Sequence, residues 1–352
     1  MAATLTQENV LNALRVVQDP DLNKDIVALG FVKNLQIDGG DVRFTIELTT
    51  PACPVKDKLK AEAEAAVMAL DGVGRVLVEM TAQVAQSQPA YEGRPAIPGV
   101  RNVIAVSSGK GGVGKSTVSV NLACALSKSG AKTAILDADL YGPNIPIMMG
   151  VSGEPMTQGK KIIPFERHGI QVMSIGLLVP DDQPVIWRGP MLHSAIKQFL
   201  FDVAWGELDY LIVDLPPGTG DAQLSLAQQA HIMGAVVVTT PQNVSVHDVR
   251  KAIRMFDQVK VPVLGVVENM SYFTPPGSDE RFPIFGEGGG EAIEREFKLP
   301  LLGQLPIDMA VREGGDTGSP VVISQPDSAI AQAMMEVAGR VAARVSTANA
   351  KN

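Results

Sequence analysis

The chain has 352 residues, of which 45% are hydrophobic and 19% charged, a balance typical of globular proteins with a substantial core. Its formal net charge of −8 argues against a protein that binds nucleic acid by neutralising phosphates. We find no targeting peptide and no apolar run long enough to span a membrane. The two cysteines cannot form a disulfide framework. We therefore expect a soluble protein of the reducing cytoplasm, with neither nucleic acid nor membrane as a partner.

The first part of the chain predicts a small α+β domain, which we place at residues 1–82. Thr6 can cap a helix whose apolar residues recur at helical spacing. An Asp-Gly-Gly turn signal then separates two strand-like runs. The elements predicted after the first helix are strands over 31–37 and 42–48, a helix over 55–70 and a third strand over 73–80.

Residues 83–100 are rich in glutamine and proline and lack apolar periodicity, which predicts a linker. From there on, residues 101–352 alternate continuous β-branched runs with helical stretches. Runs of this kind are buried on both faces, so the pattern predicts an α/β domain with a mostly parallel, doubly wound sheet. The predicted elements are strands over 103–106, 133–136, 210–213, 235–239 and 263–267 and a final helix over 326–345.

The strand over 103–106 runs directly into SSGKGGVGKST, and a helix follows. From Gly109 to Ser116 this segment matches the G-x-x-x-x-G-K-S/T spacing of a P-loop. Its glycines let backbone N–H groups surround a polyphosphate, and the helix start adds its positive dipole end. Lys115 can then reach the β and γ phosphates, Ser116 can bind Mg²⁺, and Thr117 can contact the α phosphate. The predicted ATP-binding residues are Gly109, Lys110, Gly111, Gly112, Val113, Gly114, Lys115, Ser116 and Thr117.

Three further strand ends carry polar side chains at the edge of the sheet where ligands bind. Asp137 and Asp139 follow one strand, and we expect Asp139 to orient the attacking water and Asp137 to face the metal, although the reverse order stays open. Asp214 ends another strand as a Walker B carboxylate that holds Mg²⁺ through water. Asn269 follows a third strand and is placed to read the purine. The predicted catalytic residues are Lys110, Lys115, Asp137, Asp139 and Asp214.

Lys110 adds a second lysine directly after the first glycine of the loop. The form GKGGVGKS resembles the deviant Walker A sequence of the MinD, ParA and nitrogenase iron-protein class. That resemblance implies a face-to-face homodimer in which Lys110 reaches the nucleotide of the partner subunit. The lysine would then act like an arginine finger supplied in trans.

Taken together, SSGKGGVGKST, LDADLYGPN, IVDLPPGTGD and VVENMSYF resemble the Mrp/ApbC-type iron–sulfur cluster carrier ATPases. The N-terminal unit with LTTPACP resembles the small domain that precedes many of them. The resemblance covers residues 7–340. It implies a homodimeric ATPase that receives a cluster from a scaffold protein and passes it to client apoproteins. Most carriers of this family have C-x-x-C after ENMSYF, and this chain has no cysteine there.

Cys53 is therefore the candidate iron–sulfur ligand, since Cys124 lies among apolar residues on a predicted helix and is expected to be an inert core cysteine. Cys53 precedes a predicted helix, whose N-terminus would stabilise a thiolate together with Lys56 and Lys58. A cluster usually takes four cysteine ligands. A dimer offers two copies of Cys53, so we expect transient binding with borrowed ligands.

Two alternatives from other functional classes stay open at this point. The chain could be an ATP-binding scaffold that never carries a cluster. It could also be a positioning ATPase of the MinD kind, which would need a basic amphipathic helix for the membrane. The terminal helix has only Arg340 and Arg344 and consists mostly of small apolar residues, which disfavours the second alternative.

Overall fold

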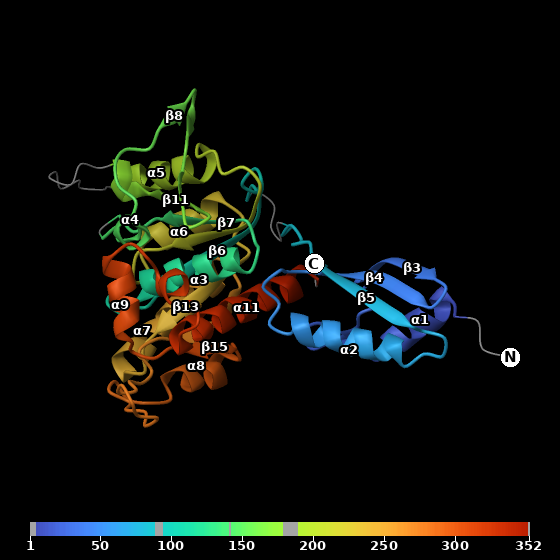
Figure 1. Ribbon diagram of the computed structural model, residues 1–352. Helices are drawn as coiled ribbons and strands as arrows, with labels where there is room; N and C mark the ends of the chain where they lie inside the picture. Colours follow the sequence, from blue (N-terminus) through green and yellow to red (C-terminus); the bar gives the residue numbers. More distant parts are fainter. Residues whose placement is uncertain (1–4, 89–93, 141, 179–188, 351–352) are drawn as a thin grey trace. The chain divides into compact units, whose positions relative to one another are not determined.

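The computed structural model describes residues 5–88, 94–140, 142–178 and 189–350. The chain divides into two compact units, unit 1 (Met1–Ala85 with Ala342–Lys351) and unit 2 (Gln86–Val341). The last turns of the C-terminal helix α11 (Ala329–Asn349) thus count with unit 1, whereas the sequence pattern groups them with the second domain. Figure 1 shows the path of the chain with its elements labelled.

Unit 1 is a small α+β unit built on a three-stranded sheet of order β3-β4-β5. The β3/β4 pair is antiparallel, and β4/β5 is parallel because the helix α2 connects these two strands. Thr6 caps α1 as predicted, since its hydroxyl accepts a hydrogen bond from the backbone N–H of Asn9. The elements are α1 (Gln7–Leu14), β1 (Gln18–Asp19), β2 (Lys24–Asp25), β3 (Val32–Asp38), β4 (Asp41–Leu48), α2 (Lys56–Met68) and β5 (Arg75–Ala82).

Unit 2 contains an eight-stranded sheet of order β10-β11-β7-β12-β6-β13-β14-β15. Neighbouring strands are parallel except for the β10/β11 pair. The five predicted strands are confirmed and form its centre, where a continuous apolar run lets each strand be buried on both faces. The strands are β10 (Phe165–Arg167), β11 (Ile170–Ser174), β7 (Thr133–Asp137), β12 (Leu208–Asp214), β6 (Val100–Ser108), β13 (Gly234–Thr239), β14 (Val263–Glu268) and β15 (Leu301–Gln304), with a small hairpin of β8 (Thr157–Gln158) and β9 (Lys161–Ile162).

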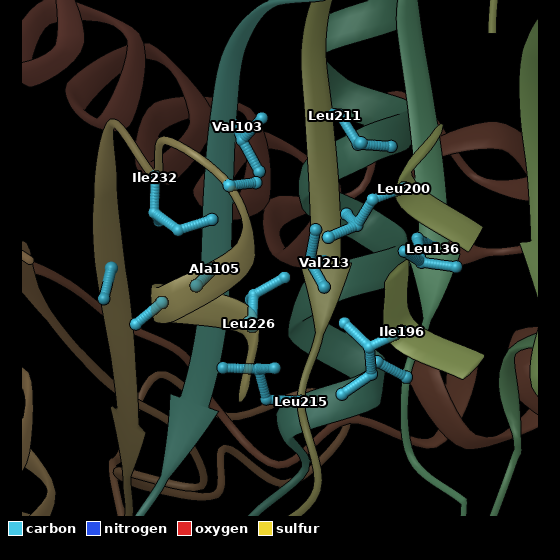
Figure 2. Packing of buried hydrophobic residues seen from close by; sticks show 14 of the residues in the cluster. Val103, Ala105, Leu136, Ile196, Leu200, Leu211, Val213, Leu215, Leu226 and Ile232 are labelled. Carbon is cyan, nitrogen blue, oxygen red and sulfur yellow. The ribbon is translucent and has the colours of Figure 1, made fainter. Parts of the chain in front are cut away.

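Helices cover the sheet and bury both sides of its strands. Figure 2 shows one face, where Val213 of β12 and Ala105 of β6 pack with Leu200 of α5 and Leu226 of α6. Ile104, which alternates with Ala105 along β6, is also fully buried. The helices of unit 2 are α3 (Lys115–Lys128), α4 (Ile145–Met149), α5 (Gly189–Phe201), α6 (Asp221–Gln229), α7 (Asn243–Gln258), α8 (Gly289–Phe297), α9 (Met309–Asp316), α10 (Val321–Ser324) and most of α11, with a 3-10 turn η1 (Ile175–Leu178).

The predicted fold class, a P-loop α/β sheet preceded by a small α+β domain, is confirmed. Parallel strands place their carboxyl ends at one edge of the sheet, and the predicted nucleotide-site residues lie at or just after the ends of β6, β7, β12 and β14. Among the described residues, no helix combines the length and the hydropathy that crossing a bilayer requires.

Candidate active site

The predicted phosphate loop connects the end of β6 to the start of α3, and two of its glycines make contacts that leave no room for a side chain. A Cβ on Gly109 would lie 2.3 Å from the backbone carbon of Asp248 in α7. A Cβ on Gly114 would lie 2.2 Å from Nδ2 of Asn269, and Gly114 has a φ of +79°, which favours glycine. The loop is therefore wedged between α7 and the residue that follows β14.

A buried ionic cluster stands at the start of α3. The side chain of Lys115 is 6% exposed, and its Nζ lies 2.6 Å from Oδ2 of Asp214 and 3.7 Å from Oδ2 of Asp139. Ser116 donates its hydroxyl to the same Asp214 oxygen at 2.7 Å. The structure thus brings together the lysine, the serine and two of the acids that the sequence predicts. Because the Lys115 ammonium lies between two carboxylates, it can replace one of these ionic contacts by a contact with a phosphate oxygen.

Ser119 completes this cluster and was not predicted. Its hydroxyl donates to Oδ1 of Asp214 at 2.5 Å, and the residue is fully buried. Ser119 lies three residues after Ser116 on the same helix, so the two hydroxyls share one helix face. This three-residue spacing is the sequence feature from which Ser119 could have been predicted. With both hydroxyls and Lys115, Asp214 has donors on each of its oxygens.

Asp137 ends β7, and protein donors contact both oxygens of its carboxyl group. Its Oδ1 accepts from the backbone N–H of Asp139 at 3.1 Å, and its Oδ2 accepts from the N–H of Ile145 and the hydroxyl of Ser174. Burial raises the pKa of the Asp137 carboxyl, and the nearby Asp214 carboxylate raises it further. Three protein donors occupy a side chain that we expected to face the metal. In the structure Asp137 joins the end of β7 to the start of α4 and to β11, and the choice between Asp137 and Asp139 for the metal stays a prediction.

A cavity of about 780 Å³ opens beside the loop. Polar groups of Lys110, Lys115 and Asp139 line it together with the apolar side chains of Phe285 and Val311, which were not predicted. The combination fits a ligand with a charged tail and a flat apolar ring. The cavity joins residues that lie far apart in the sequence, and no spacing pattern predicts its apolar part.

Asn269 lines this cavity and is held by the loop. Its Nδ2 donates to the backbone carbonyl of Val113 at 2.9 Å. A carbonyl oxygen can only accept, so the amide nitrogen must face Val113 and Oδ1 is the atom left to accept from another group. This arrangement suits the exocyclic amine of adenine.

Cys53, in unit 1, is half-buried, and the thiolate prediction is wrong for the protein without iron. Burial raises the pKa of Cys53 to about 11. A hydrogen bond from Val55 and the charge of Lys56 lower it, whereas the carboxylates of Asp19 and Asp21 raise it. Within the described part of the chain, no three His, Cys, Asp or Glu side chains form a metal-binding group.

Cys124 lies in the core of unit 2, as predicted. It is 0% exposed, and burial raises the pKa of its thiol to about 12. A thiol of this kind is protonated and out of reach of iron. Of the two cysteines, Cys53 is therefore the one that a cargo could reach.

We expect iodoacetamide to alkylate Cys53 about tenfold more slowly than a free thiol at pH 7. A pKa raised from 9.0 to about 11 lowers the thiolate fraction at pH 7 about 100-fold. Because a more basic thiolate is also more nucleophilic, each thiolate reacts about tenfold faster, and the net rate falls about tenfold. The rate should rise with every pH unit toward 11. Mass spectrometry of wild type and Cys53→Ser separates Cys53 from Cys124, and a rate that levels off near pH 8 would contradict the assignment.

Comparison with known proteins gives matches over both units. Residues 99–342 match the protein-family model described as NUBPL iron-transfer P-loop NTPase, and residues 7–78 match the one described as iron–sulfur cluster assembly protein. Several curated relatives are named iron–sulfur cluster carrier protein. The relative from Synechocystis is 52% identical over 98% of this chain and 99% of its own length. The relative from Deinococcus radiodurans is 47% identical over 96% of this chain and 95% of its own length.

Solved structures match about two thirds of the chain. A nucleotide-binding protein in complex with ADP from Archaeoglobus fulgidus has a TM-score of 0.58 and 42% identity, over 66% of this chain and 91% of that chain. The cell division ATPase MinD of Pyrococcus furiosus has a TM-score of 0.51 and 27% identity, over 68% of this chain and 98% of that chain. The resemblance that the sequence motifs carry is confirmed, and the chain belongs to the family of iron-transfer P-loop NTPases.

Proposed function

We propose that this protein is an ATP-dependent carrier that binds iron–sulfur clusters and transfers them to apoproteins, acting as a homodimer in the cytoplasm. One observation carries the proposal. A single chain joins a match to the iron–sulfur assembly family with a phosphate loop whose lysine, serine and carboxylates already meet at one point. We assign residues 1–82 to the assembly-type domain, 83–100 to a linker and 101–352 to the ATPase domain. Partners would be a cluster scaffold and client apoproteins.

The phosphate end of the site follows from the ionic cluster. Lys115 exchanges its contact with Asp214 for the β and γ phosphates of ATP, while the N–H groups of the loop and the hydroxyl of Thr117 hold the rest of the chain of phosphates. Ser116 and Asp214 present hard oxygen atoms within 2.7 Å of each other, which fits Mg²⁺. The ion would neutralise charge that develops on the transferring phosphoryl group.

Hydrolysis needs a group that orients water and a cation for the developing charge. Asp139 lines the cavity and lies near Lys115, so we assign the water to Asp139. Lys110 lines the same cavity, and in a face-to-face dimer it would reach the partner's nucleotide. Asp137 acts indirectly, because it holds the backbone of Asp139.

Asn269 should make the protein prefer ATP to GTP by about 10- to 100-fold, the ratio expected when a buried acceptor meets the carbonyl of guanine in place of the amine of adenine. Asn269→Ala should weaken the binding of both nucleotides and bring their Kd values close together. Titration of both nucleotides measures the ratio. As a control, Asn144→Ala removes another amide that lines the cavity, and this variant should keep the wild-type preference for ATP over GTP. If Asn269→Ala also kept that preference, Asn269 would not be the residue that recognises adenine.

The cluster is cargo, and Cys53 is its proposed ligand. Since the unbound thiol is protonated, iron must displace its proton. Two copies of Cys53 in a dimer leave other positions of the cluster to a small thiol or to a partner protein. Such a shared site suits transient loading and release.

Anaerobic reconstitution tests this site. Wild type with iron, sulfide and a small thiol should show the visible absorption of a cluster, and Cys53→Ser should not, while Cys124→Ser should load as wild type does. No cluster on wild type would refute the carrier function and leave the ATPase intact. Equal loading of wild type and Cys53→Ser would remove Cys53 as a ligand.

An ATP-binding scaffold is the second candidate. It is favoured by one observation, that the described residues offer no group of three metal ligands. A scaffold needs bound ATP but not hydrolysis. Asp139→Asn should therefore support apoprotein maturation if the protein is a scaffold, and should fail if it is a carrier.

A further inference from the structure

Lys110 makes a contact within its own chain that the proposed dimer has to break. Its Nζ donates to Oε1 of Gln242 at 3.3 Å. Gln242 directly precedes α7. A lysine ammonium has three N–H donors, but a Lys110 side chain turned toward Gln242 in its own chain is not extended across an interface toward a partner's phosphate.

The accepting amide is fixed in place. Thr240, which is 2% exposed, donates its hydroxyl to the same oxygen of Gln242 at 2.9 Å. The backbone N–H of Thr240 donates in turn to the hydroxyl of Ser245 in the first turn of α7. Gln242 therefore presents an oriented oxygen to Lys110 with little loss of side-chain freedom.

The loop also packs closely against α7 at this point. Gly109, next to Lys110, packs so closely on Asp248 and Val249 of α7 that a Cβ would lie within 2.4 Å of their backbone atoms. The backbone beside Lys110 thus lies directly against α7, which keeps the lysine side chain within reach of Gln242. A rotation of the Lys110 side chain alone is enough to break its contact with Gln242.

We propose that Gln242 is a positioning residue that retains the trans-acting Lys110 in the unpartnered protein and releases it when two ATP-loaded subunits meet. A neutral acceptor is suited to this role, because a phosphate outcompetes it, whereas a carboxylate would hold the lysine more firmly. The contact thereby sets the protein concentration at which the dimer closes. This inference rests on the proposed homodimer.

The test compares two substitutions with opposite effects. Sedimentation velocity with Mg²⁺ and a non-hydrolysable ATP analogue gives the dimer dissociation constant. Gln242→Ala frees Lys110 in both subunits and should lower this constant about tenfold, because the dimer releases two such contacts and each is worth about threefold at a partly exposed site. Gln242→Glu pairs with Lys110 and should raise the constant by about the same factor. In the Lys110→Met background neither change should shift the constant.

The controls separate this role from a structural one. Gln258→Ala and Gln258→Glu make the same changes at the exposed end of α7 and should leave the constant unchanged. Shifts of both Gln242 variants in one direction, or shifts that persist without Lys110, would overturn the inference while the homodimer stands. A wild-type protein that stays monomeric with the analogue would refute the homodimer itself and the inference with it.

Discussion

Lys115→Met is expected to weaken ATP binding about 100-fold or more, because it removes a buried cation from the phosphates. The same change should lower kcat by about 10²- to 10³-fold, as loss of a preorganised charge in a closed site does. Lys115 has two carboxylates within 3.7 Å and is 6% exposed, so few waters could replace it. Isothermal titration and phosphate release measure the two effects.

The protein without nucleotide should also lose stability when Lys115 is replaced. Asp214 is 0% exposed and would keep only the hydroxyls of Ser116 and Ser119. Removal of one member of a buried ion pair costs about 3–5 kcal/mol, and we expect the lower end because those donors remain. Chemical denaturation checks this. Lys128→Met, at the exposed far end of α3, serves as the matched control and should retain stability, binding and turnover.

Lys110→Met should bind ATP nearly as wild type does and yet lose about 10³-fold in kcat, the scale expected for a cation supplied in trans. The reason lies in the different places of the two lysines. Lys115 is buried against Asp214, whereas Lys110 contacts the neutral Gln242 and lines the cavity. Loss of hydrolysis with retained binding therefore distinguishes Lys110 from Lys115.

Mixing two inactive variants shows whether Lys110 acts across the dimer. In a heterodimer of Lys110→Met with Asp139→Asn, the first subunit keeps its own Asp139 and receives Lys110 from the second. An equimolar mixture should recover about a quarter of wild-type turnover, since half of the dimers are mixed and each has one working site. A mixture that stays inactive would place the action of Lys110 within its own chain.

The central strands and the phosphate loop could be predicted because each has a local signature. Five continuous apolar runs became the core strands, and the loop spacing fixed the place of Lys115 and Ser116. The outer strands escaped prediction for a physical reason. β15 has four residues and includes a glycine, and β11 mixes polar with apolar residues, so neither carries the pattern of a strand buried on both faces.

The site could be predicted only as far as contacts follow from spacing. Asp137 and Asp139 share one motif, and only the fold shows that Asp137 is taken up by donors from α4 and β11. The raised pKa of Cys53 likewise depends on burial and on Asp19, which lies far from it in the sequence. The partnership of Lys110 with Gln242 joins residues 132 positions apart, a distance at which no local pattern applies.

Cluster transfer from the loaded protein to an apoprotein is the most direct measurement of the account. Wild type and Lys115→Met should load equally under anaerobic conditions, because the cargo ligand is Cys53. With Mg²⁺ and ATP, wild type should then deliver its cluster faster than without nucleotide, and Lys115→Met should show no such acceleration. Transfer rates that are the same with and without ATP in the wild-type protein would contradict an ATP-dependent carrier.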